Sequence, residues 1–387
     1  MNELEQLRQQ IDRIDRQLLP LFLERMDVCS AVAEYKRSVG KPVLDSARER
    51  QVLADKLKLL SDPAREREVY EFFAAVMAIS RDLQTRALRH EAGKQRIAEL
   101  LKPSQPIQNP RVAFFGTAGS YSEDAAVACF SEQAERFCCP AFEDVFAAVA
   151  DKSADYGVVP IENSSTGTIA DVVDLFTAYP VFIVGEVDLP IRHCLLGLPD
   201  AGLDKIRKVY SHEQGLLQCR DYLRTLGDVQ LEECASTAMS ARLVAEQGDP
   251  ALAAVAGRRN AALYGLKVLA ENINVNDGNT TRFVVIGRQA EITPACDKIS
   301  VAFTLPHESG ELHRVLACFA RGGLNLLKLE SRPIPGKTFE YRFYVDYTGC
   351  LLDEQVRRVT DQVIEGTQEF QFLGNYCANR TRAVTEG

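Results

Sequence analysis

Lys102-Pro103-Ser104-Gln105-Pro106-Ile107-Gln108-Asn109-Pro110 divides the chain into two parts with different patterns. Its three prolines stand among polar residues, which favours an extended linker over a helix or a strand. Upstream, glycine is almost absent, because Gly40 stands alone until Gly93, and the apolar spacing predicts helices only. Downstream, strand-like runs alternate with helix-like runs, which is typical of α/β layers.

The composition describes a globular chain of several domains. Its 387 residues exceed the roughly 100–150 residues of a common domain, so we expect about two to four domains. Hydrophobic residues make up 46% and charged residues 26%, which excludes a mainly disordered chain. The net charge of −9 gives no sign of a basic face, so no nucleic-acid partner is expected.

The N-terminal residues and the cysteines favour a cytoplasmic protein. The first residues lack the segments of a signal peptide, and no apolar run approaches the roughly 18–20 residues of a membrane span, so no membrane partner is expected. The 11 cysteines are scattered and lack Cys-x-x-Cys spacing. We interpret them as reduced, buried thiols, with one nucleophilic cysteine as the alternative.

An apolar seam runs along the first predicted helix and includes a permanent cation. Its a and d positions are Leu4, Leu7, Ile11, Ile14, Leu18, Leu21, Arg25, Val28 and Val32. Arg8 and Lys36 lie in the adjoining column. A buried arginine needs a partner, and no acidic residue shares the seam. Arg25 therefore binds an anionic ligand, pairs with another helix, or extends its head group to water.

The spacing of two arginines indicates a shared site. Arg8 and Arg25 are 17 positions apart, which is roughly 25 Å along a helix. They cannot hold one small ligand on one straight helix, so a common site would take Arg8 from a second copy of the chain. We therefore expect a homodimer or a higher homo-oligomer. Pro20 lies inside this helix and is expected to kink it.

Two further helices are predicted before the linker. The first begins near Asp45, where Ser46 and Glu49 fit a capping box. Asp62-Pro63 begins the second, with a cap residue followed by proline in the first turn. Ser80 and Gln84 lie one turn apart on the apolar face of this helix. They are either satisfied core polar groups or the partners of the basic seam.

These residues resemble the all-helical chorismate mutase family over residues 1–95. The matching positions are Arg8, Arg25, Lys36, Asp45, Arg48, Glu49, Ser80 and Gln84. The resemblance implies an intertwined dimer that rearranges chorismate to prephenate. It assigns the three arginines, with Asp45 and Ser80, to substrate binding, Lys36 and Gln84 to the ether oxygen, and Glu49 to the ring hydroxyl. Such a site acts by holding the compact conformer and stabilising charge.

The α/β part has two loops suited to carboxylates. They are Gly116-Thr117-Ala118-Gly119-Ser120-Tyr121-Ser122-Glu123 and Glu162-Asn163-Ser164-Ser165-Thr166-Gly167-Thr168. Each precedes a predicted helix, so it is either an anion-binding loop or a turn with a helix cap. The chain has no Gly-x-Gly-x-x-Gly, no P-loop and no metal-binding motif, so we expect no cofactor and no metal. The dispersed histidines, His193 and His212 among them, favour structural roles.

Residues 110–287 resemble the prephenate dehydratase family. The resemblance is in Gly119-Ser120-Tyr121-Ser122, in Val158-Val159-Pro160-Ile161-Glu162-Asn163, in Gln218-Cys219 and in Thr281-Arg282-Phe283. It implies two α/β lobes, like a periplasmic binding protein, with prephenate between them. Thr281 is the leading hydroxyl, as proton donor or as orienting group, with Asn163 and Gln218 as polar partners. The residues assigned to substrate binding are Ser120, Tyr121, Ser122, Glu162, Ser164 and Thr168.

The C-terminal part follows a second break at Gln289-Ala290-Glu291-Ile292-Thr293-Pro294-Ala295. Its pattern is β-α-β-β-α-β, which predicts a ferredoxin-like α+β fold. It resembles an ACT domain, which implies phenylalanine binding between paired domains. The residues assigned to the effector are Gly310, Leu312, Glu330, Ser331, Arg332 and Pro333. A purely structural dimerisation domain is the alternative.

The order of the three parts resembles bifunctional chorismate mutase–prephenate dehydratases. The predicted boundaries are 1–100 for the helical domain, 101–109 and 288–297 for linkers, 110–287 for the dehydratase domain and 298–387 for the ACT domain. The resemblance implies a cytoplasmic enzyme that converts chorismate to prephenate and then to phenylpyruvate, inhibited by phenylalanine. The alternatives are a non-catalytic sensor and an enzyme that has kept only one activity.

Overall fold

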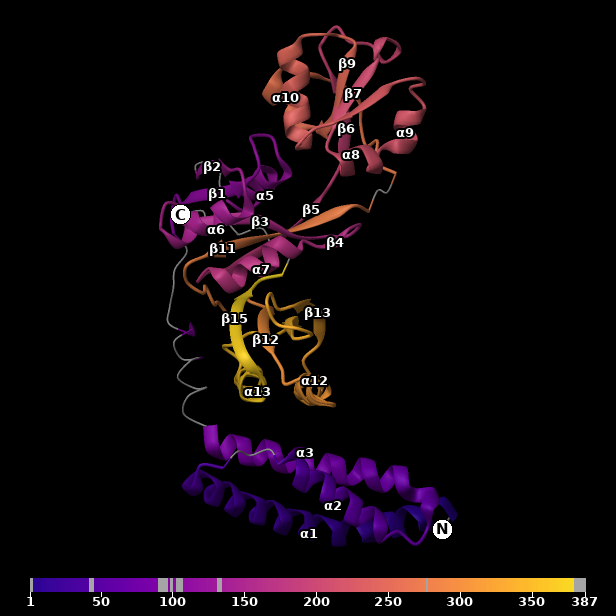
Figure 1. Cartoon of the computed structure of the whole chain (residues 1–387), viewed down its shortest axis with the longest axis vertical. Helices are drawn as coiled ribbons and strands as arrows, with labels where there is room; N and C mark the ends of the chain where they lie inside the picture. The colour runs from indigo at the N-terminus through magenta and orange to yellow at the C-terminus, as the bar shows by residue number, and fades with distance from the viewer. Residues whose placement is uncertain are drawn as a thin grey trace.

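The computed structural model describes residues 3–41, 45–89, 97, 100–101, 107–130, 134–275 and 278–378. A helical module, a two-lobed α/β domain and a C-terminal α/β module follow one another along the chain (Figure 1). The helical module and the smaller lobe lie at opposite ends of the long axis (Figure 1). Within the described residues, no helix combines the length and the hydropathy needed to cross a membrane.

The helical module confirms the all-helical prediction for the N-terminal part. Its helices are α1 (Glu3–Val39), α2 (Ser46–Lys58) and α3 (Glu66–Arg89), with a 3-10 turn at Pro63–Arg65 before α3. The Asp62 carboxylate caps this turn, because it accepts a hydrogen bond from the Ala64 N–H at 3.0 Å. At Pro20, where a kink was expected, α1 continues as one helix.

The apolar seam of α1 remains open to solvent in the single chain. Leu7 is 52% exposed, Ile11 57% and Leu18 43%, although each lies at a predicted a or d position. α2 and α3 therefore cover only part of this helix. An exposed apolar stripe of this length marks a surface for a further partner.

The larger lobe contains a mixed sheet in the order β5-β11-β3-β1-β2. Its strands are β1 (Arg111–Phe115), β2 (Glu135–Cys139), β3 (Tyr156–Asn163), β5 (Phe182–Pro190) and β11 (Thr280–Gly287), with β4 (Gly167–Thr168) paired to the end of β3. The helices are α5 (Tyr121–Cys129), α6 (Phe142–Ala150) and α7 (Ala170–Ala178). Apolar clusters under α5 and under α6 and α7 bury both faces, which explains the continuous apolar run that begins β3.

The smaller lobe has a separate five-stranded sheet in the order β10-β6-β9-β7-β8. Its strands are β6 (His193–Gly197), β7 (Lys208–Ser211), β8 (Gln230–Glu233), β9 (Leu252–Gly257) and β10 (Lys267–Ala270). Its helices are α8 (Glu213–Gln218), α9 (Arg220–Arg224), α10 (Thr237–Gln247) and α11 (Arg259–Tyr264), with a 3-10 turn at Leu203–Lys205. The chain enters this lobe after β5 and returns before β11 (Figure 1).

The C-terminal module confirms the β-α-β-β-α-β prediction. It consists of β12 (Lys298–Thr304), α12 (Glu311–Arg321), β13 (Leu326–Pro333), β14 (Tyr341–Thr348), α13 (Glu354–Gly366) and β15 (Gln368–Tyr376). The strand order β13-β14-β12-β15 is that of a ferredoxin-like sheet. β15 also pairs with β5 at Gly374 and Ile183, so this sheet continues into the sheet of the larger lobe.

The segment expected as the second linker contains no helix or strand, but hydrogen bonds hold it against the larger lobe. The Arg288 guanidinium donates to the Ala154 carbonyl at 2.6 Å, and the Tyr156 hydroxyl donates to Glu291 at 2.5 Å. Ala290 and Cys296 are buried. Most of the first expected linker, residues 102–106, and the last residues, 379–387, lie outside the described residues.

Gly374 permits the close approach of β15 to β5. A Cβ atom there would lie 2.2 Å from the Ile183 carbonyl oxygen, which is backbone and cannot move aside. We expect Gly374→Ala to lower the free energy of unfolding by about 1–3 kcal/mol through overpacking. Gly185→Ala on the same strand pair is the control, because its Cβ would meet Val285 at an ordinary 3.6 Å. Thermal unfolding of the two variants measures the difference, and equal midpoints would contradict the prediction.

Candidate active sites

The half-buried Arg25 of the helical module contacts α3. The Arg25 guanidinium on α1 donates a hydrogen bond to the Ser80 hydroxyl, which in turn donates to the Val76 carbonyl at 2.7 Å. Ser80 is only 4% exposed. The structure therefore brings two predicted site residues together across α1 and α3.

Gln84 lies one turn beyond Ser80 and is also buried. Its Oε1 atom is buried without a hydrogen-bond partner among the described residues. An unsatisfied buried acceptor costs about 1–3 kcal/mol, so it needs an explanation. A ligand that donates a hydrogen bond to Gln84 Oε1 would satisfy this acceptor.

The start of α2 differs from the predicted capping box between Ser46 and Glu49. The N-cap is Asp45, whose carboxylate accepts from the Arg48 N–H at 2.9 Å. The Glu49 carboxylate instead forms an ion pair with Arg81 of α3. Asp45 therefore caps α2, and the ion pair with Arg81 holds the Glu49 side chain toward α3.

The remaining predicted residues of this site are less enclosed. Arg8, Asp45 and Arg48 are exposed and Lys36 is half-buried. Arg8 lies in the second turn of α1, and within the described residues no hydrogen bond or ion pair joins it to Arg25, Ser80 or Glu49. One chain alone therefore brings together only some of the residues predicted for this site.

The site predicted in the α/β domain begins with the register of two strands. β3 and β11 are antiparallel, and the register places Asn163 opposite Thr281 and Glu162 opposite Arg282. The Asn163 side-chain amide donates to the Thr281 hydroxyl oxygen at 2.8 Å. Because side chains alternate between the faces of a strand, the first pair lies on one face and the second pair on the other.

Gln218 reaches this pair through Asn279, and it also contacts His193; sequence reasoning missed both as site residues. The Asn163 amide also donates to Asn279 Oδ1 at 2.9 Å, and Asn279 Nδ2 donates to Gln218 Oε1 at 3.0 Å. His193 Nε2 contacts the same Gln218 oxygen at 3.1 Å. Asn279 stands two positions before Thr281, so the period of two along a strand is a signal that would have found it.

His193 is a neutral, buried imidazole. Burial lowers its pKa to about 4, against which the hydrogen bond to Gln218 acts only weakly. Its Nδ1 atom contacts the Tyr121 hydroxyl at 3.1 Å, and that hydroxyl also lies 2.9 Å from the Arg192 carbonyl oxygen. Burial raises the pKa of Tyr121 as well. The predicted residue Tyr121 therefore joins α5 of the larger lobe to the start of the smaller lobe.

The first predicted anion loop is closed by its own contacts. Ser120 is the N-cap of α5, accepting from the Glu123 N–H at 3.4 Å, and the Glu123 carboxylate accepts from the Gly119 N–H at 2.7 Å. The buried Asn260 of the smaller lobe donates to the Gly119 carbonyl at 2.9 Å. Ser122 is buried within α5. The contacts of this loop are those of a turn with a helix cap. Gly119 also contacts the smaller lobe through Asn260.

The second predicted anion loop turns around Asn163. Its Oδ1 accepts from the backbone N–H groups of Ser165 at 2.9 Å and Thr166 at 3.2 Å. The Ser164 hydroxyl donates to the Gly278 carbonyl at 3.2 Å. These contacts fix the Asn163 amide, so that its nitrogen faces Thr281.

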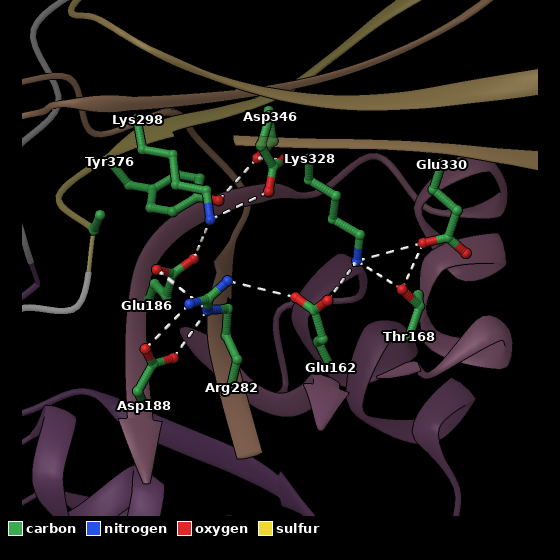
Figure 2. Close-up of polar contacts among 12 residues, drawn as sticks. Glu162, Thr168, Glu186, Asp188, Arg282, Lys298, Lys328, Glu330, Asp346 and Tyr376 are labelled. Atoms are coloured by element: carbon green, nitrogen blue, oxygen red, sulfur yellow. Dashed lines mark hydrogen bonds and ion pairs between the residues drawn. The ribbon is translucent and has the colours of Figure 1, made fainter. Parts of the chain in front are cut away.

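Glu162 and Thr168 belong to a network of charges between the larger lobe and the C-terminal module (Figure 2). Lys328 of β13 donates to the Thr168 hydroxyl at 2.7 Å and lies 3.6 Å from Glu162. The Thr168 hydroxyl donates to Glu330 at 2.5 Å. On the larger lobe, Arg282 binds Asp188, Glu162 and Glu186.

The most enclosed pair of this network is Lys298 with Glu186 (Figure 2). Their side chains are 4% and 2% exposed, and the ammonium lies 2.6 Å from Glu186 and 3.2 Å from Asp346. Burial raises the pKa of Glu186. Burial acts to lower the pKa of Lys298, but Asp346 and Glu186 outweigh it and raise that pKa. A charge of either sign left alone here would be strongly destabilising.

The predicted effector residues lie on two different surfaces. Gly310 begins α12 with a φ of 89°, and Leu312 lines a cavity of about 330 Å³ with Leu305, Tyr341 and Phe343. Along β13 the side chains alternate. Glu330 faces Thr168, and Arg332 binds Asp174 at 2.9 Å, so both point at the larger lobe. Ser331 and Pro333 are exposed on the other face.

Among the described residues, no group of three or more histidine, cysteine, aspartate or glutamate side chains is arranged to hold a metal ion. The two sites are built from amide, hydroxyl, guanidinium and ammonium groups. Such groups bind and orient anionic substrates and stabilise developing charge.

A helical module with a half-buried arginine, joined to a two-lobed α/β domain with an amide–hydroxyl site, defines a multidomain enzyme for anionic substrates. Residues 7–85 match the family model described as "Chorismate mutase type II", and residues 112–291 match the one described as "Prephenate dehydratase". A "Bifunctional chorismate mutase/prephenate dehydratase" from Aquifex aeolicus is 33% identical over 97% of this chain and 98% of its own length. The chain belongs to the family of bifunctional chorismate mutase/prephenate dehydratases.

Two solved structures each match about 70% of this chain. A prephenate dehydratase from Arthrobacter aurescens, in complex with L-Phe, has a TM-score of 0.64 and 30% identity, covering 70% of this chain and 90% of that one. A protein named as GqqA, a quorum quenching acylase, also has a TM-score of 0.64, with 31% identity, covering 69% of this chain and 98% of that one. The shared fold alone therefore does not determine the chemistry. Both family models and the full-length relative agree on two activities, chorismate mutase and prephenate dehydratase.

Proposed function

We propose that the helical module uses Arg25, Ser80, Gln84, Glu49, Lys36 and Arg48 for chorismate, together with Arg8 of a second copy. The rearrangement is pericyclic and needs no proton transfer, so the site acts by holding the substrate compact and stabilising charge on the breaking ether. The unpaired Gln84 oxygen supports a ligand-binding position beside Ser80. Lys36 and the Gln84 amide nitrogen have the polarity that the ether oxygen requires.

The dehydratase step is assigned to Thr281, Asn163 and Gln218, with Ser120, Tyr121, Ser122 and Ser164 around them. The observation that carries it is the Asn163–Thr281 hydrogen bond, at the point where both lobes meet. In the reaction the bond to the ring carboxylate breaks, carbon dioxide leaves, and its electron pair makes the ring aromatic. The opposite hydroxyl leaves as hydroxide, and a hydrogen-bond donor such as Thr281 assists its departure as water.

The test of both steps is the conversion of chorismate by the purified chain. The wild type is expected to form phenylpyruvate, whereas Thr281→Val is expected to stop at prephenate. Loss of one acid–base group lowers kcat by roughly 10²–10⁴-fold. Thr280→Val is the matched control, because within the described part of the chain the Thr280 hydroxyl contacts the Gly278 carbonyl and no residue assigned to the site. Full phenylpyruvate formation by Thr281→Val would refute the site, and no turnover of either substrate would favour a sensor.

The exposed seam of α1 supports a homodimer, because burying it in a second copy would remove apolar surface from water. A second copy would also bring a distant residue such as Arg8 to a site on α3. The arrangement is isologous, so the two copies would share two equivalent sites. A cytoplasmic location remains part of the proposal.

Shared sites predict complementation between two inactive variants. Arg8→Ala and Arg25→Ala chains are each expected to lose chorismate turnover when expressed alone. In co-expressed mixtures, one site of each mixed dimer holds both arginines, so about a quarter of the wild-type activity should return. Prephenate turnover serves as the internal control, since neither arginine lies in that domain. Failure to recover any mutase activity would contradict the shared site.

The C-terminal module is proposed as an ACT domain that binds phenylalanine and inhibits the dehydratase. The Arthrobacter aurescens structure contains L-Phe, and the cavity at Leu312 is lined by apolar side chains such as Tyr341 and Phe343 and also by polar and charged ones, among them His307 and three glutamates. The buried ion pair of Glu311 with Arg314 lies beside this cavity. The contacts of β13 with Glu162 and Thr168 give such binding a physical connection to the loop of Asn163.

If β13 connects phenylalanine binding to the dehydratase site, removing the charged contacts of Lys328 should weaken the inhibition. Lys328→Met keeps the length of the side chain and removes the contacts with Glu162, Glu330 and Thr168. We expect the phenylalanine concentration for half-inhibition of prephenate turnover to rise roughly tenfold. Lys337→Met is the control, because the ion pairs of Lys337 among the described residues are with Glu340 and Glu369 of the same module. Equal inhibition of both variants would exclude this route.

A further inference from the structure

Two consecutive residues of α3 bind the other two helices of the helical module. Ser80 accepts a hydrogen bond from Arg25 of α1, and Arg81 forms an ion pair with Glu49 of α2. Successive side chains of an α-helix are about 100° apart around its axis, so Ser80 and Arg81 point toward two different neighbours. The surface of α3 between these two directions therefore lies between α1 and α2.

Gln84 belongs to this surface of α3. A step of four positions from Ser80 turns the side chain by about 40°, so Gln84 points between Ser80 and Arg81, one turn further along the helix. Among the described residues, Gln84 Oε1 and Arg81 Nε are both buried without a hydrogen-bond partner. An unsatisfied acceptor and an unsatisfied donor one turn apart indicate a place that receives a polar ligand.

The ion pair of Arg81 with Glu49 is partly enclosed. Its side chains are 23% and 24% exposed, whereas those of Arg67 and Glu71, an ion pair on the same helix, are 86% and 62% exposed. Water screens an exposed pair almost completely, but it screens an enclosed pair much less. The charge of Glu49 would therefore act strongly on its surroundings if Arg81 were absent.

Chorismate carries two carboxylates, so an unpaired carboxylate in its site would repel it. Resting on the chorismate site proposed above, we propose that Arg81 is a positioning residue for the mutase reaction. Its guanidinium fixes the Glu49 carboxylate in one place and offsets the negative charge of that carboxylate against the dianionic substrate. Arg81 acts on the substrate through Glu49, and it is not among the residues that the family resemblance assigns.

The two parts of this role have different kinetic signatures. The carboxylates of chorismate keep their charge during the rearrangement, so repulsion by Glu49 weakens binding of the substrate and of the transition state alike. Such a loss raises KM. A Glu49 carboxylate that is no longer fixed holds the compact conformer less well, and this lowers kcat. A merely structural loss would reduce the fraction of folded enzyme, and with it kcat, without raising KM.

Arg81→Met tests both parts, because it keeps an unbranched side chain and removes the charge. For the purified full chain, we expect the KM for chorismate to rise roughly tenfold and kcat to fall by a similar factor. Arg67→Met is the matched control, since it removes the exposed ion pair of the same helix. Turnover of added prephenate should be unchanged in both variants, because that reaction belongs to another domain.

Two further variants separate the charge of Arg81 from its packing. Glu49→Gln removes the charge that Arg81 offsets, so adding it to Arg81→Met should bring KM to within about threefold of Glu49→Gln alone. Arg81→Lys keeps the cation but lacks the planar fork of a guanidinium. Its KM should stay within about threefold of the wild type while kcat falls roughly tenfold. This variant decides the question even if Arg81→Met does not fold.

Several results would overturn the proposal. One is a wild-type KM in folded Arg81→Met, and another is a KM in the double variant that multiplies the two single losses. A tenfold higher KM with unchanged kcat in Arg81→Lys would also contradict it. A faster Arg81→Met would mean that the ion pair keeps Glu49 away from the substrate. Full chorismate turnover by Arg25→Ala would instead overturn the site on which the proposal rests.

Discussion

The pairing of β3 with β11 in one register is the constraint on which both the catalytic arrangement and its connection to the C-terminal module depend. The register sets Asn163 against Thr281 on one face, and Glu162 against Arg282 on the other. One face carries the Asn163–Thr281 hydrogen bond, and the other binds Lys328 through Glu162. Residues that are adjacent in sequence therefore serve two surfaces, and a shift of one residue would exchange them.

The sequence was most informative where local chemistry decides the structure. The scarcity of glycine and the heptad seam predicted the helical module, and the β-α-β-β-α-β pattern predicted the C-terminal module; both agree with the structure. The Asp62-Pro63 cap was also correct. The motifs around Asn163, Gln218 and Thr281 named three residues that the structure connects, although Asn163 and Thr281 are 118 positions apart.

What the sequence did not predict depends on contacts between distant elements. Ser46 and Glu49 matched a capping box, but the attraction of Arg81 on another helix decided where Glu49 points. Lys298, at a predicted domain boundary, gave no sign of its enclosed pair with Glu186. His193 favoured a structural role in the sequence, because an isolated histidine does not show that both ring nitrogens are bound. Only the packed structure supplies these partners.

The pair of Lys298 with Glu186 has a consequence for how freely this enzyme can be rebuilt. From sequence the C-terminal module resembles a removable unit, yet its ammonium neutralises a carboxylate buried in the neighbouring domain. A truncated enzyme would retain Glu186 without that cation, and a chimera would inherit whatever residue the donor module has at that place. Engineers who exchange such modules must also transfer the residues that pair with them, because the ion pair of Lys298 with Glu186 spans two domains.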